Sequence, residues 1–377
     1  MKKGSWVYAL TVVLSVLFIV LGYNMFKDFH VESADNMTFY QAKVISIDGY
    51  EESLDYANNI ITTISFTARF DEGEQKGEAI TCIQEVGMVA AQDKRITQGD
   101  NIFIVYAENM RNGEIQWMFG GYNRVMPQII LCAAFLGFII LIGRTKGIST
   151  ILSLVFTILA VFFVYVPSIL SGFNVYLSTV ATGAFIVLMS MLLINGADRK
   201  TLCAVLGTFG GALLAALLAL LMNHIMKITG YVEEDAFFLS TLGGGGRTLN
   251  LLAIAWGSMV LGSIGAIMDV SMSIASPMYE LYQHMTDRTF TKMFRSGMNI
   301  GQDAIGTMTN TLILAYIGGS LSLVLLLIVY SSNPLILFST EMIAVSVVQA
   351  ITGSMGILFA VPFSALFSAY IYCRQKD

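Results

Sequence analysis

"GSIGAIMDVSMSIASPMYEL", residues 262–281, is apolar enough for a lipid bilayer over much of its length, yet it carries two carboxylates, Asp269 and Glu280. On a helix with about 100° per residue, the small and polar residues of this region fall in one narrow stripe. The stripe consists of Ser258, Gly262, Gly265, Asp269, Ser273, Ser276 and Glu280. Small residues let another helix approach closely, and carboxylates in such a stripe face protein or water rather than lipid.

The composition places this stretch in a membrane protein. Hydrophobic residues make up 55% of the 377-residue chain, charged residues make up only 12%, and the mean hydropathy is +0.70. A soluble domain has about 25% charged residues. The expected fold class is therefore mainly α, with a polytopic bundle of membrane helices.

Eight apolar runs are long enough for the roughly 20 residues that a helix needs to cross a bilayer. They are residues 6–26, 126–143, 148–168, 174–195, 201–223, 249–269, 304–330 and 351–373. The first run follows Lys2 and Lys3 as a signal peptide would, but no small-residue cleavage site follows Leu21. This favours an uncleaved N-terminal anchor helix over residues 1–26, with cleavage as the alternative.

Residues 27–125 differ from the rest of the chain. They contain 16 acidic and 8 basic residues. Their apolar residues alternate with polar ones in five runs, "FYQAKVISI", "ITTISFTARF", "EAITCIQE", "NIFIVYAENM" and "EIQWMF". This pattern predicts a small antiparallel β-barrel or sandwich after the first span, with a hairpin at Asn112–Gly113.

Basic residues indicate the orientation of the spans. With the N-terminus inside, the short inner segments contain eleven basic residues and the short outer loops contain only two, Lys227 and Arg247. The eleven are Lys2, Lys3, Arg144, Lys146, Arg199, Lys200, Arg288, Lys292, Arg295, Arg374 and Lys376. We therefore expect a multi-pass protein of the cell (cytoplasmic) membrane, with both termini in the cytoplasm and residues 27–125 outside.

The membrane domain, residues 126–377, is expected to contain seven spans and two irregular segments. Residues 335–350 are apolar but short, which favours a half-helix or a re-entrant segment. A continuous helix over residues 249–285 would be about 55 Å long, and Pro277 favours a break. That span is therefore expected to end near Asp269, close to the cytoplasmic mouth.

The following span begins with "GQDAIGTMTN", residues 301–310, in which Asp303, Thr307 and Asn310 share one helical face. Two neighbouring helices would thus bring Asp269 and Asp303 to a similar depth, where the pair could relay a proton or a cation. In this interpretation Ser273, Thr307, Asn310 and Glu280 line the same path.

A plainer interpretation stays open. The two aspartates could lie at the headgroup boundary and pair with Arg288, Lys292 or Arg295, and Glu280 could be solvated. Gly207 and Gly211, like Gly262 and Gly265, are expected to serve helix packing.

No motif of a hydrolase, a metalloprotease or a P-loop occurs, and the three histidines have no ligand spacing. We expect no catalytic residue, no metal and no cofactor, so the chain is not expected to be an enzyme. The acidic outer domain argues against nucleic acid as a partner.

"GSMVLGSIGAIMDVSMSIASPMYEL" (257–281) and "GMNIGQDAIGTMTNTLILAYIGGSLSLVLLL" (297–327) resemble the YibE/F-like family of bacterial multi-pass membrane proteins. The resemblance implies a partner in the bilayer that lacks residues equivalent to 1–125, hence a hetero-oligomer. A homo-oligomer is the alternative. It implies no particular active site.

Two functions are compatible with these features. The first is a secondary transporter, or a subunit of a transport complex, that uses carboxylates near the cytoplasmic mouth. The alternative is a scaffold or sensor that does not transport, whose outer β-domain binds a partner or a cation.

Overall fold

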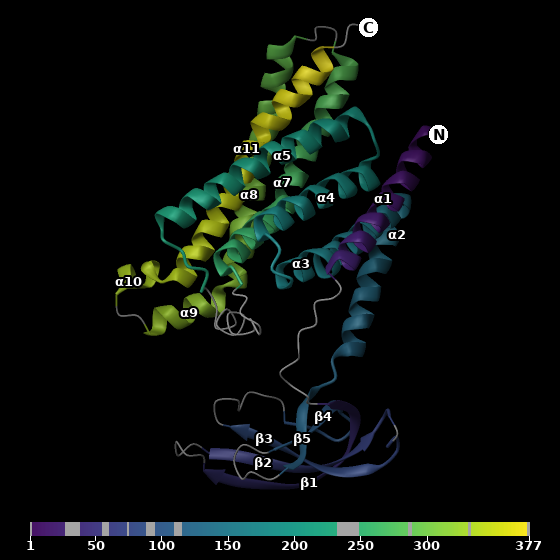
Figure 1. The fold of residues 1–377 in the computed structure, drawn as a ribbon, viewed down its shortest axis with the longest axis vertical. Coiled ribbons are helices and arrows are strands. Elements are labelled where there is room, and N and C mark those ends of the chain that lie inside the picture. Colours follow the sequence, from purple (N-terminus) through teal and green to yellow (C-terminus); the bar gives the residue numbers. More distant parts are fainter. Residues whose placement is uncertain are drawn as a thin grey trace. The chain divides into compact units, whose positions relative to one another are not determined.

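The computed structural model describes residues 2–26, 38–54, 60–73, 75–87, 95–108, 115–231, 249–285, 289–330 and 333–374. The chain divides into two compact units, and each is described by itself. The helical unit comprises the N-terminal helix and residues 139–377, and the β unit comprises residues 31–138. Figure 1 shows the elements of both units. The Asn112–Gly113 turn, Arg247 and Arg288 lie outside the described residues.

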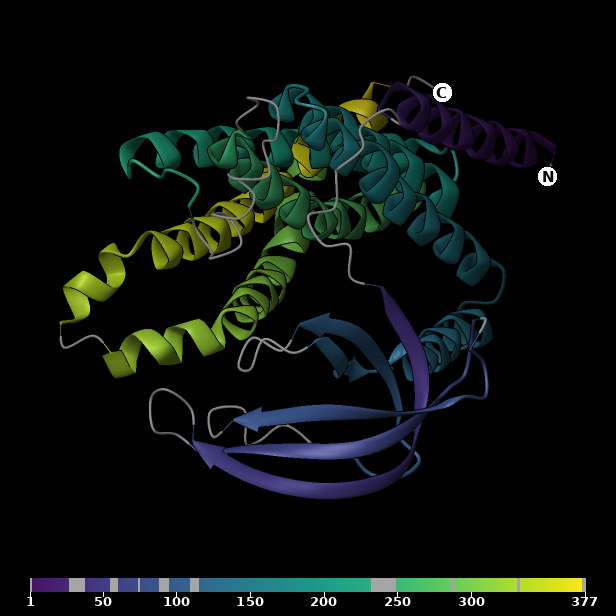
Figure 2. The same cartoon turned by 60° about the horizontal axis from the view of Figure 1, so that its bottom comes forward.

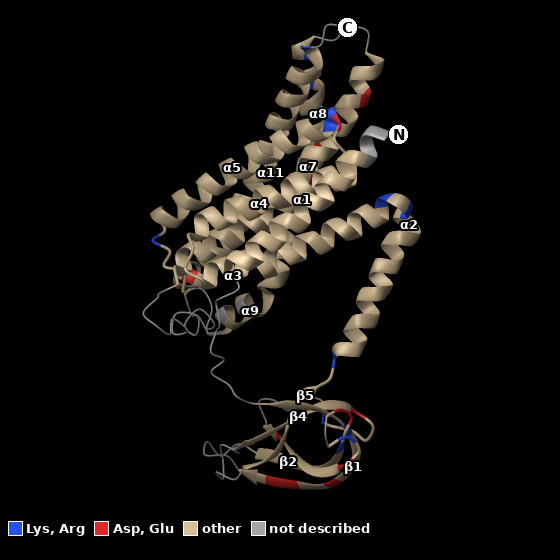
Figure 3. Cartoon of the chain, turned by 45° about the vertical axis from the view of Figure 1, so that its right-hand side comes forward, with Lys and Arg blue, Asp and Glu red and all other residues tan. Residues whose placement is uncertain are grey.

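The helical unit consists of helices, one of which, α2, begins within the β unit. They are α1 (Lys2–Phe26), α2 (Val125–Ala160), the π-helical turn η1 (Val161–Tyr165), α3 (Val166–Leu170), α4 (Val175–Asn195), α5 (Arg199–Ile225), α7 (Leu251–His284), α8 (Phe290–Gly319), α9 (Leu321–Tyr330), α10 (Pro334–Ser339) and α11 (Glu341–Cys373). Their charged residues lie mostly near helix ends and at the bend in α2 (Figure 3).

Six helical segments in the described part of the chain are long and apolar enough to cross a membrane. The eight expected spans differ from this number in two places. One segment, Val125–Leu170, contains two of the expected spans. The expected span 304–330 is divided between α8 and α9, and neither of these is among the six.

The bend in α2 separates the two expected spans at Arg144, whose backbone has φ 50° and ψ −127°. Gly147 lies against the carbonyl of Ile139, so a side chain at position 147 would have no room. Arg144 and Lys146 make this bend polar, between two apolar stretches of α2.

Helix α7 does not end at Asp269, contrary to the expectation. It runs for 34 residues from Leu251 to His284, with Pro277 inside it. Side chains on both sides of the proline are fully buried, among them Ile274 and Met278. Packing on neighbouring helices therefore holds the helix together where the proline removes one backbone hydrogen bond.

Residues 335–350 do not form a separate half-helix. The short helix α10 ends at Ser339, and the remainder begins α11, which continues for 33 residues to Cys373. The Glu341 side chain accepts hydrogen bonds from Thr229 N at 2.7 Å and Gly230 N at 2.8 Å. Glu341 thereby ties the segment after α5 to the start of α11.

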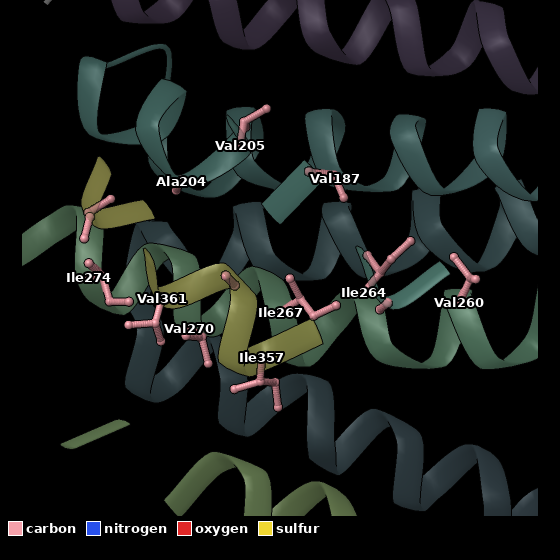
Figure 4. Close-up of a cluster of buried hydrophobic side chains, with 14 of the residues drawn as sticks. Val187, Ala204, Val205, Val260, Ile264, Ile267, Val270, Ile274, Ile357 and Val361 are labelled. Carbon is pink, nitrogen blue, oxygen red and sulfur yellow. The ribbon is translucent and has the colours of Figure 1, made fainter. Parts of the chain in front are cut away.

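The core of the helical unit lies where α11 packs against α5, α7 and α8. Figure 4 shows Ile267, Val270 and Ile274 of α7 beside Ile357 and Val361 of α11, and all five side chains are fully buried. This core faces one side of α7, which leaves the opposite side for other contacts.

The β unit contains the five expected strands, β1 (Phe39–Leu54), β2 (Ile60–Phe70), β3 (Ala79–Gly87), β4 (Asn101–Glu108) and β5 (Ile115–Tyr122). The pairing order is β1-β2-β3-β5-β4, with β4 also paired to β1. Apolar side chains on the inner face form its core, and the long strands curve around them (Figure 2).

The expected antiparallel barrel or sandwich needs one correction. The β3–β5 pairing is parallel, and a single bridge between Ile83 and Met118 makes it. The sheet is therefore mixed, and the seam between β3 and β5 is joined at only one point, so it is not a fully closed barrel. The other four strand pairs are antiparallel, as expected.

Candidate functional site

The polar stripe of α7 lies on an exposed face of the chain. Six of its seven residues are exposed, and Ser276 is half-buried. Ile267 and Ile274 lie about 160° and 140° around the helix from Asp269 and are fully buried. The stripe is therefore on the side of α7 that faces away from the core.

Helix α8 carries a second exposed polar face. Asp303, Thr307 and Asn310 are all exposed. They lie within about 80° of Ile300 around the helix. Ile300 lines a groove of about 570 Å³ together with Ser276 and Glu280 of α7. Asp269, Asp303, Thr307 and Asn310 do not line this groove. We call the polar stripes of the two helices together the polar face: Ser258, Gly262, Gly265, Asp269, Ser273, Ser276, Glu280, Asp303, Thr307 and Asn310.

The register of α7 against α8 relates the two aspartates. A Cβ atom on Gly301 would lie 3.2 Å from Ile274 Cδ1, and one on Gly262 would lie 3.3 Å from the Tyr316 hydroxyl. The helices thus run in opposite directions. Asp303 is two residues from Gly301, so along the helix axis it is level with the turn just after Asp269, and around α8 it lies about 160° from Gly301. The offset along the helix axis is about 5 Å.

The alternative of ion pairing finds no support among the described residues. Neither Asp269 nor Asp303 forms an ion pair with Lys292 or Arg295. Thr307 Oγ1 donates to the carbonyl of Ala304 within its own helix at 3.2 Å, so its proton is used locally. Among the described residues, neither carboxylate has an ion-pair partner.

A carboxylate facing lipid would be costly, because insertion of Asp at the centre of a membrane helix costs about 2.5–3.5 kcal/mol. Two such groups with hydroxyl and amide neighbours are compatible with protein or water on this face and poorly compatible with acyl chains. The arrangement can exchange protons or coordinate a hydrated cation. In the described part of the chain, no group of three or more His, Cys, Asp or Glu residues could hold a metal ion.

The four glycines expected to serve helix packing divide into two pairs. Gly207 packs directly on Ser364, and a Cβ on Gly211 would lie 2.7 Å from the Gly356 carbonyl and 2.9 Å from Ala360 Cβ. These two positions allow α5 and α11 to pack closely. A Cβ on Gly262 would have some neighbours, but one on Gly265 would meet no atom within 4 Å, so Gly265 is not a packing position in the described part of the chain.

Sequence patterns did not identify the hydroxyl groups that are buried between α5 and α11. Ser364, Ser368 and Tyr372 recur every four residues on α11 and are fully buried. Their spacing is the ordinary helical period, so a single sequence offers no signal that separates them from packing residues. Hydroxyl groups of this kind commonly join helices in membranes.

A comparison with family models found one match, described as YibE/F-like protein, over residues 131–374. The matched range is well over half of the chain and contains every residue of the polar face. Of the β unit it contains only residues 131–138, which are part of α2. Comparisons with curated proteins and with solved structures found no match.

Proposed function

Since this chain belongs to the YibE/F-like family, we propose that it is a secondary transporter, or a subunit of a transport complex, whose polar face lines the transport path. Asp269 and Asp303 are the groups that bind and release the coupling proton or cation in this proposal. In this proposal they lie toward the cytoplasmic side, as the distribution of basic residues predicts.

One observation supports the proposal above the others: two carboxylates that have no ion-pair partner among the described residues lie on exposed faces of α7 and α8, at levels about one helical turn apart along the helix axes. A second chain in the bilayer would complete the path by covering this face, either a related protein without an outer domain or another copy. Water between the two chains would keep the carboxylates accessible.

The proposal is tested by measuring ions and metabolites in cells that lack this chain. We expect a small set of solutes to change on deletion and to be restored by the wild-type chain. Asp269→Asn and Asp303→Asn should fail to restore them at equal membrane abundance, because an amide cannot carry the proton. Asp198→Asn is the matched control, since Asp198 is exposed in the helical unit but lies outside the polar face.

Restoration by both amide variants would refute the carboxylate relay. If deletion changes no solute and only releases partner proteins from the membrane, the scaffold or sensor alternative replaces transport.

A further inference from the structure

The β unit contains a cleft of about 1000 Å³ at the seam between β3 and β5. Gln84, Glu85 and Val86 of β3 line one wall, and Phe119, Gly121 and Tyr122 of β5 line the other. Arg95, Thr97, Asp100 and Arg124 complete the lining. The two strands separate here because only one bridge joins them. The volume is in the range of small-molecule sites, about 300–1000 Å³.

A β-bulge shapes the β5 wall. The register of β5 against β4 shifts by one residue next to Gly121, which has φ +139°. Bulges re-aim side chains and are common beside binding sites. Phe119 and Tyr122 flank the bulge with ring centroids 5.1 Å apart, and they give the cleft an aromatic surface.

A chain neighbour of each arginine, Ile96 for Arg95 and Asn123 for Arg124, has a backbone N–H that is held by a hydrogen bond. Ile96, next to Arg95, is 1% exposed, and its N–H donates to Gln84 Oε1 at 3.1 Å. Asn123, next to Arg124, donates from its N–H to the Asn101 carbonyl at 2.9 Å. The guanidinium of Arg124 also lies 5.8 Å from the centre of the Tyr122 ring. Both arginines therefore extend from ordered positions, which lowers the entropic cost of binding.

The charges in the cleft leave the two guanidinium groups available. The β unit is acidic, yet neither Arg95 nor Arg124 forms an ion pair with a described carboxylate. Asp100 Oδ2 already accepts hydrogen bonds from Thr97 N at 2.8 Å and Thr97 Oγ1 at 3.0 Å. The Glu85 side chain lines the cleft too, and Glu85 already interacts with another group. Guanidinium groups bind phosphate and carboxylate in a two-pronged geometry.

We propose that the β3–β5 cleft binds an organic phosphate, with the phosphate held by Arg95 and Arg124 and the organic part packed on Phe119 and Tyr122. The phosphate can belong to a soluble ester or to a phospholipid headgroup, because Arg124 directly precedes the apolar helix α2. This site is separate from the polar face and does not depend on the proposed transport function.

The test is calorimetric titration of the purified full chain with phenyl phosphate, first in detergent. We expect saturable binding at one site. Arg95→Gln and Arg124→Gln should each weaken it by about tenfold or more, because each removes charge-assisted hydrogen bonds. Arg69→Gln is the matched control: Arg69 is exposed on β2 and is not among the residues that line the cleft. It should bind like the wild type.

Two further measurements separate a specific site from a folding defect or general charge effect. Arg124→Lys keeps the positive charge but loses the planar guanidinium, which can bind phosphate through two hydrogen bonds. This variant should therefore also bind phenyl phosphate more weakly, at an unchanged melting temperature. Phe119→Leu should weaken phenyl phosphate more than inorganic phosphate. Absence of phenyl phosphate binding, or equal weakening by Arg69→Gln, would overturn the proposal.

The source of the phosphate follows from repeating the titration in bilayers of phosphatidylcholine, with and without phosphatidylglycerol. If phosphatidylglycerol prevents phenyl phosphate from binding to the wild type, the cleft is an anion site occupied by a headgroup. Unchanged binding supports the same site with a soluble ester as its ligand.

Discussion

Cys82 illustrates how burial controls one residue in the β unit. Its side chain is 1% exposed, and burial raises the pKa of the thiol from its ordinary value of 9.0 to about 12. The thiolate is the reactive form, so a shift of this size lowers its population about a thousandfold at a pH below both values. Among the described residues, the Cys82 thiol forms one weak hydrogen bond, to the Ile80 carbonyl at 3.9 Å.

We therefore expect native Cys82 to resist alkylation by iodoacetamide between pH 7 and pH 9, where an exposed thiol reacts increasingly fast. The measurement is mass spectrometry of a variant in which Cys132, Cys203 and Cys373 are serine. Rapid reaction after unfolding in urea is the control. Reaction of the native protein at the rate of a free thiol would show that Cys82 is not buried in solution.

Asp269 shows what a single sequence can and cannot determine at the residue scale. The helical period placed it correctly in a stripe with Ser273 and Glu280, because the angle between residues depends only on helix geometry. The sequence could not tell whether the stripe faces a neighbouring helix of the same chain or its exterior. That choice depends on the pairing of α7 with α5 and α11, which is a property of the tertiary fold.

At the scale of elements, propensity and packing favoured different outcomes in α7. Pro277 predicted a break, but α7 continues through it to His284, and Ile274 and Met278 on either side of the proline are fully buried. The same competition explains α11: the first residues looked too short for a span by themselves, yet they extend a helix anchored at Glu341. The β3–β5 pairing escaped prediction because alternation identifies strands but not their partners or direction.

The close packing of α5 on α11 gives an element-scale prediction. Gly211→Ala should lower the melting temperature, because the added Cβ would lie 2.7 Å from the Gly356 carbonyl. Overpacking of this kind costs about 1–3 kcal/mol. Gly265→Ala is the matched control in a helix with open space, where alanine is favoured over glycine by about 0.5–1 kcal/mol. The measurement is thermal unfolding of both variants in detergent. Equal effects would mean that Gly211 does not mediate close packing.

At the scale of the whole molecule, the sequence separated a strand-rich region from a helical region, because the two regions differ in hydrophobic period. Period two over 39–119 predicted strands, and long apolar runs after 125 predicted helices. The number of spans was harder to predict, since length alone does not distinguish a bent helix at Arg144 from two spans. No change in composition marks the break of the expected span 304–330 after Gly319, because apolar residues continue on both sides of it.

Sidedness is the whole-molecule prediction that the distribution of basic residues makes most directly. In a background without native cysteines, Met226→Cys should react with a membrane-impermeant maleimide in intact cells. Thr145→Cys should react only after the membrane is opened. Both positions are exposed, and neither substitution removes a basic residue that sets the orientation. Mass spectrometry or gel shift measures the labelled fraction, with opened membranes as the control for reactivity.

The reverse labelling pattern would place the β unit in the cytoplasm, where the acidic region would face soluble cell components. It would also put Asp269 and Asp303 on the outer side of the path, so the direction in which they take up a proton would be inverted as well.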